Sequence, residues 1–276
     1  MLTSNYHTHT SLCDGRDTPE EMLAYALELN MTHLGFSGHM DQEISMDVKE
    51  YYDRIRELKR KFSGRIDILT GIELDTLFDP SCAYDAEYII GSTHYLDVQA
   101  PPSLSPSVDN TPQDLAALCT EFYEGDYYQL AKAYYELESQ VVDRLHCTFI
   151  GHFDLVVRFN DECHFLDETD PRYLNPALEA MEYLVSKQVP FEINCGAVNR
   201  GRKKELYPHP LLLKALREFG GEIIISSDAH QKELLLGGFD AAVLSAVRCG
   251  FTHTNILEHD SGGRVVFRQV PLDALL

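Results

Sequence analysis

HLGFSGHMDQEISMDVKEYYDRIRELKRKFSGRIDILTGIELD, residues 33–75, contains the pattern that decides the fold. A short apolar run at 33–37 is followed by an amphipathic stretch at 47–62 and a second apolar run at 66–72. Such alternation is typical of two parallel strands joined by a helix. Each predicted strand is followed at once by a polar residue, His39 after the first and Glu73 after the second.

The same alternation extends along the whole chain. Seven runs are predicted as strands, at 4–7, 33–37, 66–72, 88–92, 147–152, 190–193 and 222–226, and a final short strand is predicted at 264–270. Helices are predicted at 19–29, 47–62, 111–145 with a break near 125, 171–187, 208–219 and 238–248. The first helix has the clearest start, because Thr18 is an N-cap, Pro19 occupies the first helical position and Glu21 completes a capping box. Pro176 leaves open whether the helix at 171–187 begins later.

The length of 276 residues suits one large α/β domain, and we predict a single domain over residues 1–276. One segment breaks the alternation: residues 97–112, DVQAPPSLSPSVDNTP, hold four of the twelve prolines. So many prolines exclude a helix or a central strand. A long loop of this kind is either a lid over an active site or a passive surface excursion, and both interpretations stay open.

The composition excludes several classes of protein. With 44 Asp and Glu against 23 Lys and Arg, the formal net charge is -21, which would repel nucleic acid and anionic membrane surfaces, so neither is predicted as a partner. No run approaches the ~20 apolar residues of a membrane span, and MLTSNYHTHT does not resemble a signal peptide, so we expect a cytoplasmic protein. The seven cysteines never form a CxxC pair, which favours reduced thiols over disulfides or a thiolate zinc site.

Metal-binding residue types gather where the predicted strands end. They are His7, His9, His39, Glu73, His94, His152, Asp228 and His230, and only the sixth strand ends otherwise. A single HxH pair means little, because about half such a pair is expected by chance with twelve histidines. The carboxyl ends of parallel strands meet at one edge, however, and active sites form there. We therefore expect these eight side chains to meet in one site.

Imidazole and carboxylate ligands without thiolates favour zinc, manganese or iron(II) over calcium, magnesium or copper(I). Eight candidates are too many for one four-coordinate ion, so two or three divalent ions that share bridging carboxylates fit better. Such a cluster lowers the pKa of a bound water towards ~7 and provides a nucleophile at neutral pH. Hydrolysis is therefore the predicted type of reaction.

Together these residues form an ordered set of motifs. The motifs are HTHT at 7–10, Asp14, SGH at 37–39, GIE at 71–73, the histidine of THY at 94, GHFD at 151–154 and SDAH at 227–230. This set resembles that of the polymerase and histidinol phosphatase (PHP) superfamily, and the chain length is most similar to its stand-alone histidinol-phosphate phosphatases. The resemblance implies a distorted (β/α)7 TIM-like barrel, one strand short of the usual eight, and a trinuclear metal centre.

The resemblance also implies how the ligands are divided among the ions. The first ion would be held by His7, His9, Glu73 and Asp228, the second by Glu73, His94 and His152, and the third by Asp14, His39 and His230. Many relatives have histidine where Asp14 stands, so an oxygen donor there changes which metal the third position prefers. Asp14 could alternatively be a turn residue in the sequence Cys13-Asp14-Gly15.

Two arginines follow strands on the predicted active face, Arg158 after the GHFD motif and Arg200 in AVNRGRKK. The resemblance points to arginines in these regions as phosphate binders, and a planar guanidinium suits bidentate phosphate contacts. A surface salt bridge with Asp161 or Glu162 is the alternative for Arg158. Arg202, Lys203 and Lys204 are interpreted as solvated charges, although any of them could share the role of Arg200.

Roles other than metal binding are predicted for several polar residues. Asp228 is predicted to manage the proton of the attacking water or to protonate the leaving alkoxide, with His230 in reserve. Glu192 and Asn194 share one side of the sixth strand, where they either orient metal ligands or form core hydrogen bonds. The remaining histidines are interpreted as structural or surface residues: 33, 146, 164, 209, 253 and 259.

The activity implied by the resemblance is metal-dependent hydrolysis of L-histidinol phosphate to L-histidinol and phosphate in histidine biosynthesis. The partner is then a small phosphate monoester, and the sequence predicts no oligomeric state. Two alternatives remain open. The same scaffold could act on phosphotyrosine proteins or small nucleotides, or the chain could be a non-catalytic metal-binding scaffold domain.

Overall fold

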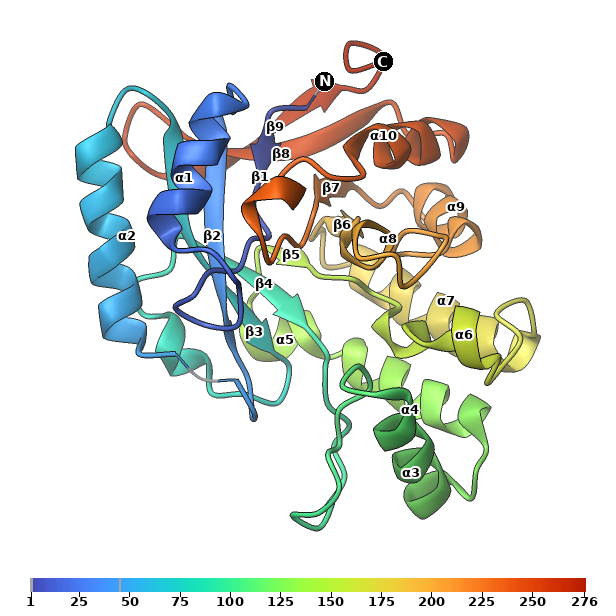
Figure 1. Cartoon of the computed structure of the whole chain (residues 1–276). Coiled ribbons are helices and arrows are strands. Elements are labelled where there is room, and N and C mark those ends of the chain that lie inside the picture. Colours follow the sequence, from blue (N-terminus) through green and yellow to red (C-terminus); the bar gives the residue numbers. More distant parts are fainter. Residues whose placement is uncertain (1, 45) are drawn as a thin grey trace.

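Nine strands form one sheet in strict sequence order in residues 2–44 and 46–276, the part of the chain described by this computed structural model (Figure 1). They are β1 (Ser4–Asn5), β2 (His33–Met40), β3 (Asp67–Asp75), β4 (Tyr88–Ser92), β5 (Phe149–Ile150), β6 (Phe191–Asn194), β7 (Ile223–Ser226), β8 (His253–His259) and β9 (Val265–Pro271). The pairs from β1 to β8 are all parallel, and β9 runs antiparallel to β8.

The chain just beyond β1 also meets the chain just beyond β7. A parallel bridge joins Thr8 to Ala229, where the His9 N–H donates to the Ala229 carbonyl at 2.9 Å and the Ala229 N–H donates to the His7 carbonyl at 3.1 Å. This contact brings the first and seventh strands together, so strands β1 to β7 curve into a barrel. The predicted α/β fold with seven parallel strands is thus confirmed, and β8 adds an eighth parallel strand beside β7.

Helices cover the outside of the barrel. They are α1 (Pro19–Glu28), α2 (Val48–Phe62), α3 (Pro112–Tyr123), α4 (Tyr127–Glu138), α5 (Val141–Leu145), α6 (Asn160–Cys163), α7 (Pro171–Val185), α8 (Gly196–Asn199), α9 (Pro210–Glu218) and α10 (Phe239–Arg248), with short 3-10 turns η1 (Pro80–Ala83), η2 (Leu155–Val157) and η3 (Lys232–Leu234). In Figure 1, α1 and α2 flank one side and α7, α9 and α10 the other. None of the helices in the described residues is long and apolar enough to cross a membrane.

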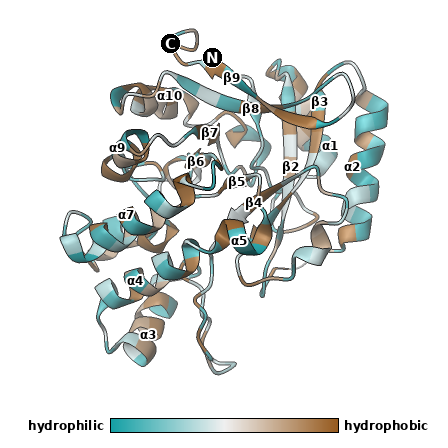
Figure 2. Ribbon diagram, turned by 180° about the vertical axis from the view of Figure 1, so that it is seen from behind, coloured by the Kyte–Doolittle hydropathy of each residue, from teal (hydrophilic) through white to brown (hydrophobic). Residues whose placement is uncertain are grey.

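The longer helices follow from local sequence signals. In α1 the capping box is formed as predicted: the Thr18 side chain accepts from the Glu21 N–H, and Glu21 accepts from the Thr18 N–H at 2.9 Å. In α2 the Asp47 side chain caps the first turn, and Tyr51, Ile55 and Leu58 recur at helical spacing on the buried face. Figure 2 shows the central strands largely in hydrophobic colours and the helices with mixed hydrophilic and hydrophobic residues.

The structure corrects two details of the sequence prediction and decides a third that was left open. The stretch at 111–145 is three helices, α3, α4 and α5, because the chain turns at Glu124 and Gly125 and again at Ser139 and Gln140. Helix α7 begins at Pro171 and keeps Pro176 inside it. Strand β8 was not predicted, because its apolar residues, Ile256 and Leu257, are few and flanked by polar ones.

Strands β8 and β9 lie at the amino end of the barrel, away from the carboxyl ends of the parallel strands. The Tyr6 hydroxyl donates to the Leu257 carbonyl at 2.7 Å, and His259 contacts Asp67 at the start of β3. Both chain termini lie at this end (Figure 1). The opposite end is left to the loops that follow the strands.

The proline-rich loop between β4 and α3 extends away from the barrel in Figure 1. Its return segment is tied to the barrel, since Ser107 pairs with Tyr95 and the Val108 N–H donates to the His94 carbonyl at 2.8 Å. Ser107, Asp109 and Asn110 line the pocket at the carboxyl end. The loop is therefore a wall of that pocket, and its motion as a lid stays a prediction.

Candidate metal centre

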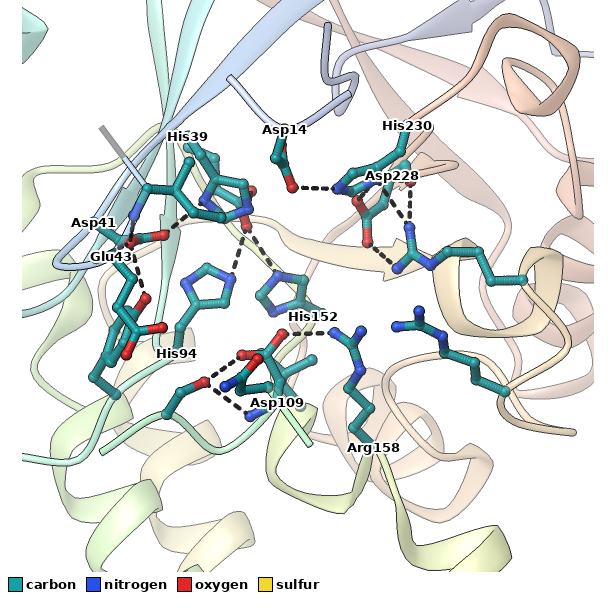
Figure 3. Close-up of a pocket in the computed structure, with 18 residues that line it drawn as sticks. Asp14, His39, Asp41, Glu43, His94, Asp109, His152, Arg158, Asp228 and His230 are labelled. Carbon is teal, nitrogen blue, oxygen red and sulfur yellow. Dashed lines mark hydrogen bonds and ion pairs between the residues drawn. The ribbon is translucent and has the colours of Figure 1, made fainter. Parts of the chain in front are cut away.

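A pocket of about 370 Å³ opens at the carboxyl ends of the strands (Figure 3). Of the nine predicted metal ligands, Asp14, His39, Glu73, His94, His152, Asp228 and His230 line it, and both predicted arginines do too. His7 and His9 are fully buried beneath it. The structure therefore brings all nine predicted ligands together.

Glu73, at the carboxyl end of β3, lies at the centre of this set. Its Oε2 atom is 3.0 Å from His7 Nε2, 3.3 Å from His9 Nε2 and 3.0 Å from His39 Nε2. Its Oε1 atom is 2.9 Å from His152 Nε2 and 3.4 Å from His94 Nε2. One buried carboxylate thus faces five imidazoles, three of them at Oε2 and two at Oε1.

A second carboxylate supports the set from behind. Glu192 on β6 is fully buried, and its Oε1 atom is 2.7 Å from His7 Nδ1. Its Oε2 atom accepts from the His152 N–H at 2.8 Å and from Asn194 Nδ2 at 2.9 Å. Because the other nitrogen of His7 faces Glu73, Glu192 fixes the orientation and tautomer of that ring. Of the two interpretations left open for Glu192, this geometry favours ligand orientation.

Asp14 lies next to the histidines rather than in an isolated turn. Its Oδ2 atom is 3.0 Å from His230 Nε2 (Figure 3), and its Oδ1 atom is 3.4 Å from His9 Nδ1. Ligand atoms of His9, Asp14, His39 and His230 all lie within 4.8 Å of one another, as do those of His7, His9 and Asp228.

Asp228 links the histidines to Arg200. Its Oδ1 atom lies 3.4 Å from His9 Nε2, while its Oδ2 atom accepts from Arg200 Nη2 at 3.0 Å. Arg200 also donates through Nη1 to the Asp228 carbonyl at 2.9 Å. Asp228 has a left-handed backbone with φ 48°, and a Cβ at Gly196 would lie 2.4 Å from its Oδ2, so this close approach requires glycine.

Arg158 is held by an unexpected partner. Its Nη1 atom donates to Asp109 Oδ2 at 2.6 Å, so the proline-rich loop and not Asp161 or Glu162 supplies the carboxylate (Figure 3). Ser107 Oγ donates to the other oxygen of Asp109 at 2.9 Å. Burial opposes ionisation of Asp109, but Arg158 and His94 lower its pKa. The pair keeps Arg158 at the edge of the pocket with 15% of its side chain exposed.

The protonation of the cluster reflects competing effects. Burial alone would lower the pKa of His7, but the carboxylates of Glu192, Glu73 and Asp228 raise it to about 10. Burial opposes ionisation of Glu73, yet the facing imidazoles of His39 and His7 hold its pKa well below the usual range. The carboxylates are therefore ionised, as metal ligands must be.

The donor set fits divalent cations. His7 Nε2, His9 Nε2 and Glu73 Oε2 are buried and close together, yet none has a hydrogen-bond partner in the described part of the chain. Buried polar atoms without partners are costly, whereas a divalent cation that displaced the imidazole protons would be bound by the nitrogen and oxygen lone pairs. Imidazole nitrogens and carboxylate oxygens are the ligands that zinc, manganese and iron accept.

Comparison with known proteins identifies the family. The model of the PHP domain matches residues 5–196. The chain belongs to the PHP domain family. The match ends before Asp228 and His230, but these two residues line the same pocket as the matched ones.

The relatives of this PHP domain are similar over most of their length. A "Probable histidinol-phosphatase" of Deinococcus radiodurans is 30% identical over 82% of this chain and 85% of that protein. Another "Probable histidinol-phosphatase", from Schizosaccharomyces pombe, is 28% identical over 96% of this chain and 92% of that protein. The crystal structure of histidinol phosphate phosphatase from Lactococcus lactis, complexed with zinc, L-histidinol and phosphate, matches with a TM-score of 0.70 at 19% identity over 96% of this chain and 100% of that one. The barrel implied by the sequence motifs is thus confirmed.

Sequence reasoning missed two features of this PHP domain. Asp109 belongs to a loop without a motif, so the sequence gave no sign of its contact with Arg158. Lys203 was expected to be solvated, but only 2% of its side chain is exposed. That expectation is wrong. A lysine beside other charged residues has the same sequence signature whether its side chain is solvated or buried against carboxylates.

Proposed function

We propose that this protein is a metal-dependent phosphatase that hydrolyses L-histidinol phosphate to L-histidinol and phosphate. The observation that carries the proposal is the presence, in one pocket, of a converging metal-ligand set and two arginines, Arg158 and Arg200. The names of the similar proteins and the histidinol and phosphate bound to the Lactococcus lactis enzyme support the choice of substrate. The whole chain would then form one phosphatase domain that acts in histidine biosynthesis.

The ligands divide as the resemblance implies. His7, His9, Glu73 and Asp228 would hold one ion, and Glu73, His94 and His152 a second. Asp14, His39 and His230 would hold the third. The donor types suit zinc, manganese or iron, in two or three sites. When bound, such ions supply Lewis acidity that makes water nucleophilic at neutral pH and neutralise phosphoryl oxygens.

The two arginines would bind the phosphoryl group, Arg200 from beside His230 and Arg158 from the wall formed with the proline-rich loop. Each guanidinium is anchored through its Nη atoms by a carboxylate, Asp109 for Arg158 and Asp228 for Arg200. Both guanidinium groups still line the pocket, where the N–H groups not used by these anchors can donate to phosphate. Donors that are already in place stabilise charge in the transition state without reorganisation.

We assign the proton transfer to Asp228. Its Oδ1 atom lies among the histidines, while Arg200 holds its Oδ2 atom. A carboxylate in this position can accept the proton of the attacking water and return it to the leaving alkoxide. His230, whose Nδ1 atom is 3.4 Å from Asp228 Oδ1, is the alternative carrier.

The rest of the pocket suits a small cationic alcohol. Asp41, Glu43 and Asp109 line the wall formed by the β2–α2 and β4–α3 loops. Carboxylates at this wall would attract the ammonium and imidazole groups of histidinol. Because a wall and a pocket of about 370 Å³ favour a small substrate, the phosphotyrosine alternative is less well supported.

The proposal is tested by phosphate release from the purified protein after reconstitution with zinc or manganese. The substrates are L-histidinol phosphate, phosphotyrosine peptides and nucleoside monophosphates at equal concentrations. We expect histidinol phosphate to give the highest kcat/KM. Preference for another ester would overturn the substrate, and no release from any ester would support the non-catalytic scaffold.

A further inference from the structure

We infer that Lys203 is a positioning residue that fixes the segment carrying Arg158 against the segment carrying Arg200. The inference rests on the proposed function only in taking both arginines as phosphate binders. Neither the metal ligands nor the pocket wall includes Lys203. Its place lies behind the two arginines, between the chain segments that follow β5 and β6.

Lys203 is a buried cation with partners from one segment. Its Nζ atom donates to the Val157 carbonyl at 3.2 Å, directly before Arg158 in the chain. The same atom lies 3.5 Å from Asp161 Oδ1 and 3.5 Å from Glu168 Oε1. All three contacts therefore hold residues 157–168, the segment that contains Arg158.

The partner segment is itself ordered around these contacts. Asn160 Nδ2 donates to the Glu168 oxygen that faces Lys203 at 2.8 Å, and Asn160 Oδ1 accepts from the Leu166 N–H at 3.1 Å. The other oxygen of Asp161 accepts from the Lys204 N–H at 2.8 Å. Asp161 thus binds both the side chain of Lys203 and the backbone that follows it.

On its own side, Lys203 belongs to a tight turn with Arg200. The Arg200 N–H donates to the Gly196 carbonyl at 3.1 Å, and the N–H groups of Arg202 and Lys203 donate to the Ala197 carbonyl at 2.9 and 3.3 Å. The turn continues directly from α8. A displacement of Lys203 would therefore also displace the backbone of Arg200, which lies three residues earlier in the same turn.

Burial restricts where the ammonium group of Lys203 can lie. An ammonium group removed from water is costly unless it is paired and hydrogen-bonded, so Lys203 has to stay within reach of both carboxylates and the Val157 carbonyl. The neighbouring Lys204 is exposed and has no such demand. The link thus sets the distance between two backbones, each of which carries one guanidinium into the pocket.

The test measures binding of inorganic phosphate to the metal-loaded protein by isothermal titration calorimetry, together with KM and kcat for histidinol phosphate. We expect Lys203→Met to raise the Kd for phosphate and the KM by roughly tenfold or more, since misplacing a binding group by about 1 Å can cost ~10²-fold. Metal content should match wild type. Lys203→Arg, which keeps the charge, should recover part of the loss, and Lys204→Met is the matched control that should behave as wild type.

A second variant covers the case in which Lys203→Met does not fold. Asp161→Asn weakens the same link from the other side at a half-exposed residue, and it should raise the same Kd in the same direction. If Lys203→Met or Asp161→Asn lowers the melting temperature but leaves the phosphate Kd and the KM unchanged, Lys203 is only structural and the inference is wrong.

Failure of the inference and failure of the proposed function give different results. Wild type that binds phosphate but hydrolyses no histidinol phosphate would overturn the function, while the Kd comparison would still decide the role of Lys203. Wild type that hydrolyses histidinol phosphate, with a Lys203→Met variant of equal Kd and KM, would overturn the inference alone.

Discussion

Histidines and carboxylates cluster at both ends of the barrel, and the two clusters differ in how their atoms are satisfied. At the amino end, His259 Nδ1 is 2.6 Å from Asp67 Oδ1 and its Nε2 is 2.9 Å from Glu87 Oε1. Each ring nitrogen has one carboxylate partner, and Lys59 pairs with Glu87 as well. At the carboxyl end, five imidazoles face the single carboxylate of Glu73.

This difference separates a structural ion-pair cluster from a metal centre better than residue types do. At the amino end, each ring nitrogen of His259 can donate its proton to a carboxylate oxygen, so the hydrogen bonds of this cluster are satisfied. At the carboxyl end His7 Nε2, His9 Nε2 and Glu73 Oε2 remain without hydrogen-bond partners among the described residues, although they are buried. Within the same residues, groups of three or more ligand atoms close enough to hold one ion occur only at the carboxyl end. The predictions below test this contrast.

The largest effect is expected at Glu73. Glu73→Gln replaces one ligand oxygen by an amide nitrogen that faces imidazoles, so metal content and phosphatase activity should fall together, the activity by more than the ~10²–10³-fold typical of losing one transition-state donor. Metal analysis and kcat/KM on the same preparation measure both. Glu87→Gln, the matched change at the amino end, should leave both unchanged. Full metal content and wild-type turnover in Glu73→Gln would show that the carboxyl-end cluster is not a metal centre built around Glu73.

Arg158→Ala should separate substrate binding from metal binding within the carboxyl end. It removes a phosphate donor that contacts Asp109 and no histidine, so kcat/KM should fall by about 10²–10³-fold while metal content stays at the wild-type level. Steady-state kinetics beside metal analysis distinguish the two. An unchanged rate would mean that Arg158 serves only its salt bridge with the loop.

The sequence predicted the fold, and the convergence of the candidate metal ligands, because both depend on regular patterns. Alternating apolar runs and amphipathic stretches define the parallel strands, and strand ends such as His39 and Glu73 must then meet at one edge. Where a pattern was lacking, prediction failed. Strand β8 has only Ile256 and Leu257 as an apolar signal, and it forms by pairing with β7 at Asn255 and with β9 along its whole length.

The contacts that hold the arginines could not be predicted, because they join segments without fixed spacing. Asp109 reaches Arg158 across 49 residues of sequence, and Lys203 reaches the Val157 carbonyl across 46. No periodicity brings such residues together. Only the folded loops decide whether a charge beside an arginine is solvated or buried.

An intermediate effect is expected at Glu192, which supports the ligands without facing the centre of the set. Its two oxygens face four donors, from His7, Ser226, Asn194 and the His152 backbone. Glu192→Gln places an amide NH2 against two of these donors, so zinc affinity should fall by about 10–100-fold, the usual cost of losing an outer partner of a ligand. Chelator competition measures it. Glu222→Gln, which changes an exposed carboxylate at the amino end of β7, is the control, and equal affinities for the two variants would exclude an orienting role.

The smallest effect is expected at His259 and depends on pH. Burial opposes protonation of His259, but Glu87 and Asp67 raise its pKa above the usual value of 6.5. Because the folded-state pKa is the higher one, its contribution to the free energy of unfolding is complete below about pH 6.5 and is lost as the pH rises through the raised pKa. His259→Gln should therefore destabilise the protein by at most about 1 kcal/mol, most at low pH, since the pairs are partly exposed.

Urea unfolding of wild type and His259→Gln across this pH range measures the difference. His253→Gln, an exposed histidine on the same strand without an ion pair among the described residues, is the matched control and should show no such trend. A destabilisation that grows with pH would mean that His259 is held neutral. The amino-end cluster would then not be an ion-pair cluster, and its contrast with the carboxyl end would lose its basis.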